Sequence, residues 1–301
     1  MIELPEAIVF SQQINEIAGG KTISNVTAAY SPHKFAWFYG DPQMYHEILY
    51  GKAIGRAAGA GGMVEIRVRN REGFEGANGA DGRDGAKVAK AKDAEDAVIT
   101  FSDGVNLRFH GENDERPQKH QLLIEFEDFT AISASVQMYG GLLCFMDGKC
   151  ENPYYLQARG KPSPLSDRFD RSYFDNIVTA HGNEGLSAKA LLATDQRIPG
   201  LGNGVLQDIL YNAGIHPKKK VKTFSTDEMD ALYDSIKYTL AEMTCQGGRD
   251  TERDLFGCFG GYKTKVGKNT VDRPCPRCGT IIKKEAYMGG SIYYCIGCQK
   301  I

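Results

Sequence analysis

The first twenty residues carry apolar side chains at helical spacing. Phe10, Ile14 and Ile17 follow an i, i+4, i+7 pattern, which places them on one face of a helix. The spacing therefore predicts a helix over residues 5–18.

Between residues 21 and 147 the hydrophobic pattern has the period of β-strands. The segment 63–69 (MVEIRVR) alternates between apolar and polar residues. The segment 97–110 (AVITFSDGVNLRFH) has an Asp-Gly pair at its centre, which favours a hairpin turn between two strands. The segment 121–138 has the pattern of a second two-strand unit. We predict an antiparallel β-sandwich or barrel, flanked by the first helix.

Glycine recurs at every third position from 73 to 85. The stretch contains no proline and is far too short for a collagen triple helix. We interpret residues 70–96 as a flexible surface insertion without chemistry of its own.

The second half of the chain has helical spacing over residues 167–245, after a Pro/Ser-rich hinge at 160–167. Its last helix is predicted to begin with Thr226 as N-cap and with Asp227 and Glu228 in the first turn. These changes of pattern predict an α+β multidomain protein with three parts. They are a β-domain over 1–160, a helical domain over 161–250, and a linker with a small final module over 251–301.

The final module contains two Cys-x2-Cys pairs. Cys275 and Cys278 are separated by sixteen residues from Cys295 and Cys298. Two such pairs can complete a tetrahedral thiolate site, most simply for Zn²⁺. Four thiolates leave no open coordination position, so the predicted zinc is structural, holding a hairpin that turns at or near Gly289. We interpret the other four cysteines as ordinary thiols: Cys144, Cys150, Cys245 and Cys258.

Composition and charge restrict the classes of function. The chain of 301 residues is 42% hydrophobic and has no apolar run of about 18 residues, which argues against a membrane span. The first residues lack a signal-peptide pattern, so we expect a cytoplasmic protein, where disulfides are rare. The net charge is −2, yet residues 261–301 hold eight Lys/Arg against two acidic residues. A nucleic-acid surface would therefore be a local patch; an ordinary solvated lysine face is the alternative.

The segment 196–217 (QRIPGLGNGVLQDILYNAGIHP) combines glycines with the start of a helix. Gly200 and Gly202 permit a close approach to whatever lies beneath the turn. Asn203 and the amides that follow it open a helix whose N-terminal N–H groups suit a phosphate. The alternative is a glycine turn between packed helices.

Three separated motifs carry a family resemblance: MIELPEA at the start, PGLGNGVLQDILYNAGIHP in the helical region, and the four-cysteine module that ends in YYCIGCQ. With these motifs the chain resembles the formamidopyrimidine-DNA glycosylase/endonuclease VIII family of base-excision repair enzymes over nearly its full length, the insertion aside. The resemblance implies a β-sandwich domain, a helix–two-turn–helix domain and a zinc finger, with damaged double-stranded DNA bound between domains by a monomer. In the cell, such a protein would be associated with the nucleoid.

The resemblance also implies the chemistry. Such enzymes flip a damaged base out of the duplex. An N-terminal proline amine then attacks the sugar C1′ as a Schiff-base nucleophile, and elimination nicks the strand. Here Ile2 stands in the proline's place, so the amine is expected on a retained Met1, a primary amine that can form a Schiff base. Glu3 and Glu6 match the acidic residues of the family motif.

Two cationic positions of the family are changed. The family's lysine on the β-domain aligns with Ala60, and its finger arginine aligns with Gly290. Lys34 or Lys52 is the alternative nucleophile to Met1.

The residues that the resemblance implies for DNA contacts match the family better than these two cationic positions do. Lys189 and Asn203 match phosphate anchors of the helical domain. Met138 matches a residue that wedges into the duplex, and Tyr154 or Tyr155 can stack on a base.

Three functions follow as alternatives. The first is a DNA glycosylase/AP lyase that uses an N-terminal amine. The second is a member of the family that binds damaged or structured nucleic acid without cutting it. A protein-interaction scaffold is the third.

Overall fold

The computed structural model describes residues 1–70 and 96–301. The insertion predicted at 70–96 lies outside the described residues except for its two ends. The chain divides into two compact units. We call Phe10–Gly59 with Val64–Asn152 the sheet unit, and Met1–Val9, Ala60–Met63 and Pro153–Ile301 together the helical unit.

In its described residues, the sheet unit contains seven strands and two short helical segments, together with most of the first helix. The elements are α1 (Leu4–Ala18, which begins in the helical unit), β1 (Ile23–Ala28), β2 (Ala36–Tyr39), η1 (Pro42–Met44), α2 (Tyr45–Leu49), β3 (Ala53–Ala60), β4 (Met63–Arg69), β5 (Ala97–His110), β6 (Leu122–Phe126) and β7 (Ala131–Met146). The first helix confirms the prediction from the periodicity, and Phe10 and Ile14 are buried. Asn15 holds it against β3 through two hydrogen bonds with the backbone of Ala57, of 2.7 and 2.9 Å.

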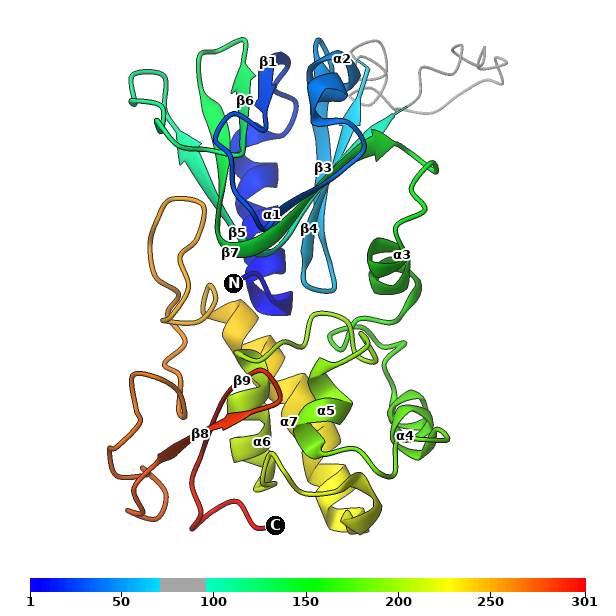
Figure 1. Ribbon diagram of the computed structural model, residues 1–301, viewed down its shortest axis with the longest axis vertical. Helices are drawn as coiled ribbons and strands as arrows, with labels where there is room; N and C mark the ends of the chain where they lie inside the picture. Colours follow the sequence, from blue (N-terminus) through cyan, green and yellow to red (C-terminus); the bar gives the residue numbers. More distant parts are fainter. Residues whose placement is uncertain (71–95) are drawn as a thin grey trace, which may run out of the picture. The chain divides into compact units, whose positions relative to one another are not determined.

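The strands follow the order β1-β6-β7-β5-β4-β3, with β2 joined to β7. Figure 1 shows the long strands β5 and β7 side by side, and they pair antiparallel along most of their length. Their register shifts between Asp103 and Val105. On one side of the shift β6 pairs antiparallel with β7, and on the other side β2 pairs with it in parallel. The two long strands thus connect the two halves of the sandwich.

The prediction of a hairpin turn at Asp103 and Gly104 is wrong. Ala97–His110 is one continuous strand of 14 residues. The Asp-Gly pair instead forms an irregularity in the ladder, where Asp103 has a φ of 58° and a Cβ on Gly104 would lie 2.5 Å from the carbonyl oxygen of Tyr139. A turn residue pair can serve a bulge as well as a turn, because both need a positive φ.

The helical unit contains the remaining helices and a two-stranded sheet. The elements are α3 (Pro153–Gly160), α4 (Arg171–Thr179), α5 (Ala188–Ala193), α6 (Val205–Ala213), η3 (Val221–Thr223), α7 (Thr226–Cys245), β8 (Lys283–Tyr287) and β9 (Gly290–Tyr294). Helices α6 and α7 lie side by side (Figure 1). Their shared core contains Leu206 and Ile209 from α6 with Ile236 and Leu240 from α7.

The N-cap of helix α7 lies one residue earlier than predicted. Ser225, not Thr226, is the N-cap, and it forms a capping box with Glu228. Asp227 and Glu228 do lie in the first turn, as predicted.

The four-cysteine module packs on α6. Its hairpin β8–β9 turns through Met288 and Gly289, both with positive φ, at the predicted place. The linker before it is fixed by Asp208 of α6, whose buried carboxylate accepts hydrogen bonds from the amides of Lys265 and Val266 at 2.9 Å. In the part of the chain that the structure describes, no helix is long and apolar enough to cross a membrane.

Candidate active site and nucleic-acid contacts

Glu3 lies at the N-terminus of α6. Its Oε1 accepts a hydrogen bond from the amide of Gly204 at 2.8 Å, and its Oε2 accepts one from the amide of Val205 at 2.6 Å. Helix N-termini bind anions because their first N–H groups have no partner within the helix. The sequence analysis predicted that these amides suit a phosphate. In the structure, the amides of Gly204 and Val205 bind the Glu3 carboxylate instead.

The glycines of this motif make room for charged side chains. A Cβ on Gly202 would lie 2.5 Å from Glu3 Oε1, and a Cβ on Gly204 would lie 1.6 Å from Arg249 Nη1. The amide of Leu4 donates to the carbonyl of Gly200 at 2.9 Å, so the backbone of the N-terminal segment is tied to the same turn. The motif thus packs directly against the N-terminal segment.

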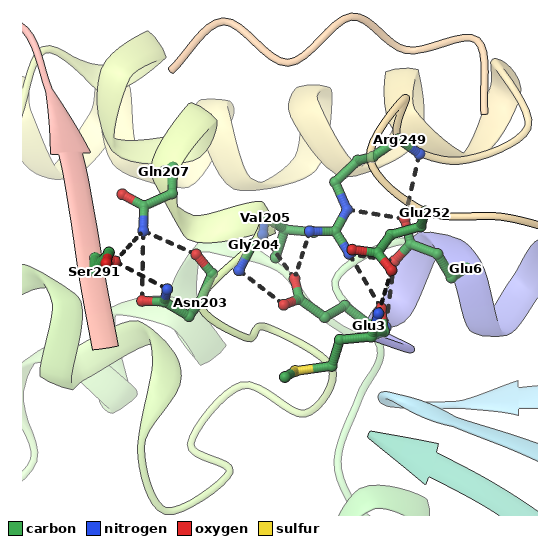
Figure 2. A network of polar contacts seen from close by, with 10 residues as sticks. Glu3, Glu6, Asn203, Gly204, Val205, Gln207, Arg249, Glu252 and Ser291 are labelled. Atoms are coloured by element: carbon green, nitrogen blue, oxygen red, sulfur yellow. Dashed lines mark hydrogen bonds and ion pairs between the residues drawn. The ribbon is translucent and has the colours of Figure 1, made fainter. Parts of the chain in front are cut away.

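Arg249 joins the two glutamates, as Figure 2 shows. Its Nε and Nη2 donate to the two oxygens of Glu6 at 2.9 and 2.8 Å, and its Nη1 lies 3.5 Å from Glu3 Oε2. Nη2 also donates to the carbonyl of Met1 at 3.3 Å. Only 2% of Arg249 is exposed. The buried pairs explain why the guanidinium tolerates this burial.

The N-terminal amine of Met1 forms an ion pair with Glu252. Arg249 and Glu252 lie in the segment after α7, and the sequence analysis does not predict them as site residues. The sequence offered one clue to them, the pair Gly247 and Gly248, which has positive φ and allows the chain to turn sharply after α7.

Burial raises the pKa of Glu3 above its ordinary value. The Arg249 guanidinium lowers this pKa and Glu6 raises it, while the amides of Gly204 and Val205 also lower it, and the net direction is upward. A carboxyl group in this position can hold a proton and release it to a reacting group.

The predicted phosphate anchors lie together against the β8–β9 hairpin. Lys189 Nζ donates to the carbonyl of Tyr287 at 2.7 Å, and Asn203 Nδ2 donates to the carbonyl of Ser291 at 3.0 Å (Figure 2 shows the second bond). A Cβ on Gly290 would lie 3.5 Å from Lys189 Nζ and 3.6 Å from Asn203 Nδ2. Gly290, which aligns with the family's finger arginine, thus lies beside both Lys189 and Asn203. Burial lowers the pKa of Lys189.

The position of the family's β-domain lysine lies at the β3–β4 turn. Ala60 there is half-buried and ends β3. The next residue, Gly61, has a φ of +57°, and its added Cβ would lie 2.8 Å from Pro199 Cβ. An added Cβ on Gly62 would lie 3.4 Å from the carbonyl oxygen of Ile2. This turn therefore packs against the glycine-rich motif and the N-terminal segment without offering a cation.

The alternative nucleophiles Lys34 and Lys52 belong to the sheet unit, whereas Met1 and Glu3 belong to the helical unit. Lys34 is exposed, with its Nζ 5.3 Å from the centre of the Phe35 ring, and Lys52 is half-buried. Both stay alternatives that only a cross-linking experiment separates from Met1.

Among the predicted base-contacting residues, Met138 is 66% exposed on β7 in the sheet unit, and Tyr154 is 45% exposed on α3. Tyr155 is only 3% exposed, and its hydroxyl accepts a hydrogen bond from Arg159. Of the two tyrosines, Tyr154 has the exposed ring that stacking on a base requires. Met138, Tyr154 and Tyr155 stay predictions.

The four cysteines of the final module lie close together. Their sulfur atoms are all within 4.8 Å of one another. Cys278 and Cys295 are 3.4 Å apart, and the Tyr211 hydroxyl lies 3.2 Å from Cys275 Sγ. Four thiols at this spacing can hold one metal ion.

These features define an α+β protein with a β-sandwich, a helical region opened by a glycine-rich turn and a four-cysteine module. Residues 161–253 match the model of the formamidopyrimidine-DNA glycosylase H2TH domain. The chain is 30% identical over 209 residues to formamidopyrimidine-DNA glycosylase of Prochlorococcus marinus, covering 65% of this chain and 70% of the relative. It is 24% identical to the enzyme of Bacillus cereus, over 99% of both chains. The protein belongs to the formamidopyrimidine-DNA glycosylase/endonuclease VIII family.

Solved structures share the fold. The Fpg protein of Thermus thermophilus matches with a TM-score of 0.74 at 21% identity, over 99% of this chain and 98% of that one. Lactococcus lactis Fpg in complex with DNA that contains an abasic site matches with a TM-score of 0.76 at 20% identity, over 99% of this chain and all of that one.

Proposed function

We propose that the protein is a monomeric DNA glycosylase and AP lyase that acts on damaged double-stranded DNA, with the Met1 amine as nucleophile and Glu3 as acid. The observation that carries this proposal is the convergence of a primary amine, three carboxylates and a buried arginine at the start of α6. Schiff-base chemistry requires an amine that is held in place, and the contacts of Met1 hold its amine.

The proposed reaction follows from these groups. The lone pair of the neutral amine forms a bond to C1′ of the damaged nucleotide, the N-glycosidic bond breaks, and the base leaves with a proton from Glu3. The attached nitrogen then gives up one proton, O4′ gains one as the C1′–O4′ bond breaks, and the result is a protonated imine between Met1 and C1′. Loss of a proton from C2′ then expels the 3′ phosphate, and water hydrolyses the imine to release the amine.

Each unit would contribute its own contacts with DNA. Lys189 and Asn203 would bind phosphate beside the hairpin, Met138 would wedge into the duplex, and Tyr154 would stack on a base. The abasic-site DNA in the complex of the Lactococcus relative supports this class of ligand.

A single Zn²⁺ would be held by Cys275, Cys278, Cys295 and Cys298. The donor set of four thiols fits zinc, and zinc there would supply structure only, because all four positions are filled by protein. Its part in the function would be to hold the hairpin against Lys189 and Asn203.

A second candidate is a member of the family that binds damaged or structured nucleic acid without cutting it. Three substitutions favour it: Ile2 replaces the proline, Ala60 a lysine and Gly290 an arginine. The ion pair of the Met1 amine with Glu252 favours it too, since a protonated amine is not a nucleophile.

Borohydride trapping separates the two candidates. The protein is incubated with a duplex that contains one abasic site, reduced, and digested, and the cross-linked peptide is identified by mass spectrometry. We expect the cross-link on Met1. A cross-link on an internal lysine such as Lys34 or Lys52 would relocate the nucleophile. Retained binding without any cross-link would establish the second candidate.

Glu3→Gln tests the acid. The glutamine keeps one oxygen for the amides of α6 but cannot supply a proton, so we expect DNA nicking to fall at least about 100-fold while binding is retained. A variant that nicks at the wild-type rate would show that Glu3 is not the acid.

A further inference from the structure

The segment after α7 forms an ordered loop whose base is closed by glycines. Isolated bridges pair Arg249 with Tyr262 and Arg253 with Phe259. A Cβ on Gly260 would lie 2.2 Å from the carbonyl of Gly248, so the two limbs of the loop cross in direct backbone contact. We call residues 249–262 the 249–262 loop. Its tight base fixes the direction in which the loop leaves α7.

The backbone of Glu252 is held on both sides within this loop. Its amide donates to the carbonyl of Arg249 at 3.1 Å, and its carbonyl accepts from the amide of Gly260 at 3.3 Å. The Glu252 carboxylate contacts the Met1 amine, and the two side chains are 26% and 33% exposed respectively. The contact is therefore positioned by the fold and is open to an incoming reactant.

The charged groups around the amine divide into pairs. Glu6 is bound by two nitrogens of Arg249, and both oxygens of Glu3 accept from α6 amides. The remaining carboxylate, Glu252, contacts the amine itself. Glu252 contacts the amine directly and can therefore exchange a proton with it.

We propose that Glu252 is a catalytic residue, the proton acceptor of the Met1 amine. This inference rests on the proposed function. Attack on C1′ gives a positively charged nitrogen with two protons, one more than the protonated imine carries. The Glu252 carboxylate takes one of them and becomes a carboxylic acid, while Glu3 gives its own proton to the departing base. The proton on Glu252 then passes to O4′ as the C1′–O4′ bond breaks and the C1′=N bond forms, so both groups end as carboxylates and the charges balance.

The test measures the rate of the cross-link. Borohydride trapping of the full-length protein on the abasic-site duplex is followed at one fixed pH for the wild type and each variant. We expect trapping by Glu252→Gln to be about 100-fold slower, as for loss of a general base. Glu252→Asp keeps a carboxylate and should recover part of the rate.

Glu242→Gln is the matched control, because Glu242 lies on α7 outside this network, 3.9 Å from Lys265, and it should trap at the wild-type rate. An unchanged trapping rate in Glu252→Gln would refute the catalytic role and leave the Met1 nucleophile standing, whereas a wild-type protein that gives no cross-link would refute both.

Discussion

Gly202 and Gly204 precede α6 at positions where charged side chains fill the space that a Cβ atom would need. Gly204 has φ −78° and ψ −55°, which any residue adopts without strain. Its requirement for glycine therefore comes from the Arg249 guanidinium and from Glu3, and not from the backbone.

Gly204→Ala tests this requirement. The new methyl group would displace Arg249, whose Nη1 lies 1.6 Å from the Cβ position, and would disturb its pairs with Glu3 and Glu6. We expect a loss of about 1–3 kcal/mol in the free energy of unfolding, measured by urea denaturation. Gly185→Ala is the matched control, since a Cβ there meets nothing within 4 Å. Equal stability of the two variants would contradict the packing of Arg249 against Gly204.

At the scale of elements, α7 is stabilised by its first turn. Ser225 Oγ accepts from the amide of Glu228 at 3.2 Å, and Glu228 accepts from the amide of Ser225 at 2.9 Å and from Lys219 Nζ at 2.7 Å. Burial alone raises the pKa of Glu228, but the hydrogen bonds from Lys219 and Ser225 lower it below the ordinary value.

Ser225→Ala should cost about 1 kcal/mol of unfolding free energy at pH 7.

Glu228→Gln should also destabilise the protein at pH 7. Because the folded-state pKa of Glu228 is lowered, its contribution is present above the unfolded-state pKa of about 4.3 and is lost as the pH falls through the folded-state value. Urea denaturation at pH 7 and pH 4 should therefore show a smaller difference from the wild type at the lower pH. A constant difference would mean that the charge of Glu228 contributes nothing.

The elements α5 and α6 present Lys189 and Asn203 to the β8–β9 hairpin. Lys189→Ala should weaken DNA binding and lower the slope of log affinity against log salt by about 1, because one phosphate contact is lost. Lys237→Ala is the control: Lys237 also donates to a backbone carbonyl, that of Phe169 at 3.3 Å, but it lies on α7 outside the predicted anchors. Fluorescence anisotropy over a salt series measures both. An unchanged slope in Lys189→Ala would place the phosphate site elsewhere.

At the scale of the whole molecule, the sequence predicted the features that leave a local pattern. Period and spacing identified the helix α1, the strand β4, the strand pair β6–β7, the hairpin β8–β9 and the cysteine set. The Asp-Gly pair misled because Asp103 takes a positive φ inside a paired strand. Arg249 and Glu252 left no such pattern: they pair with Glu6 and Met1, 243 and 251 residues away in the chain, and only the folded structure joins them.

The β8–β9 hairpin of the cysteine module contacts the predicted phosphate anchors. Its carbonyl groups accept hydrogen bonds from Lys189 and Asn203. We expect one zinc per chain by inductively coupled plasma mass spectrometry. Removal of zinc by a chelator should unfold the hairpin, because metal-binding free energy is folding free energy in such small modules, and DNA affinity should fall at least about tenfold. Cys278→Ser should lose the metal, while Cys245→Ser, at an exposed cysteine of α7, should keep it. A metal-free chain that binds DNA as tightly as the metal-loaded one would show that the hairpin holds its place through its packing on α6 alone.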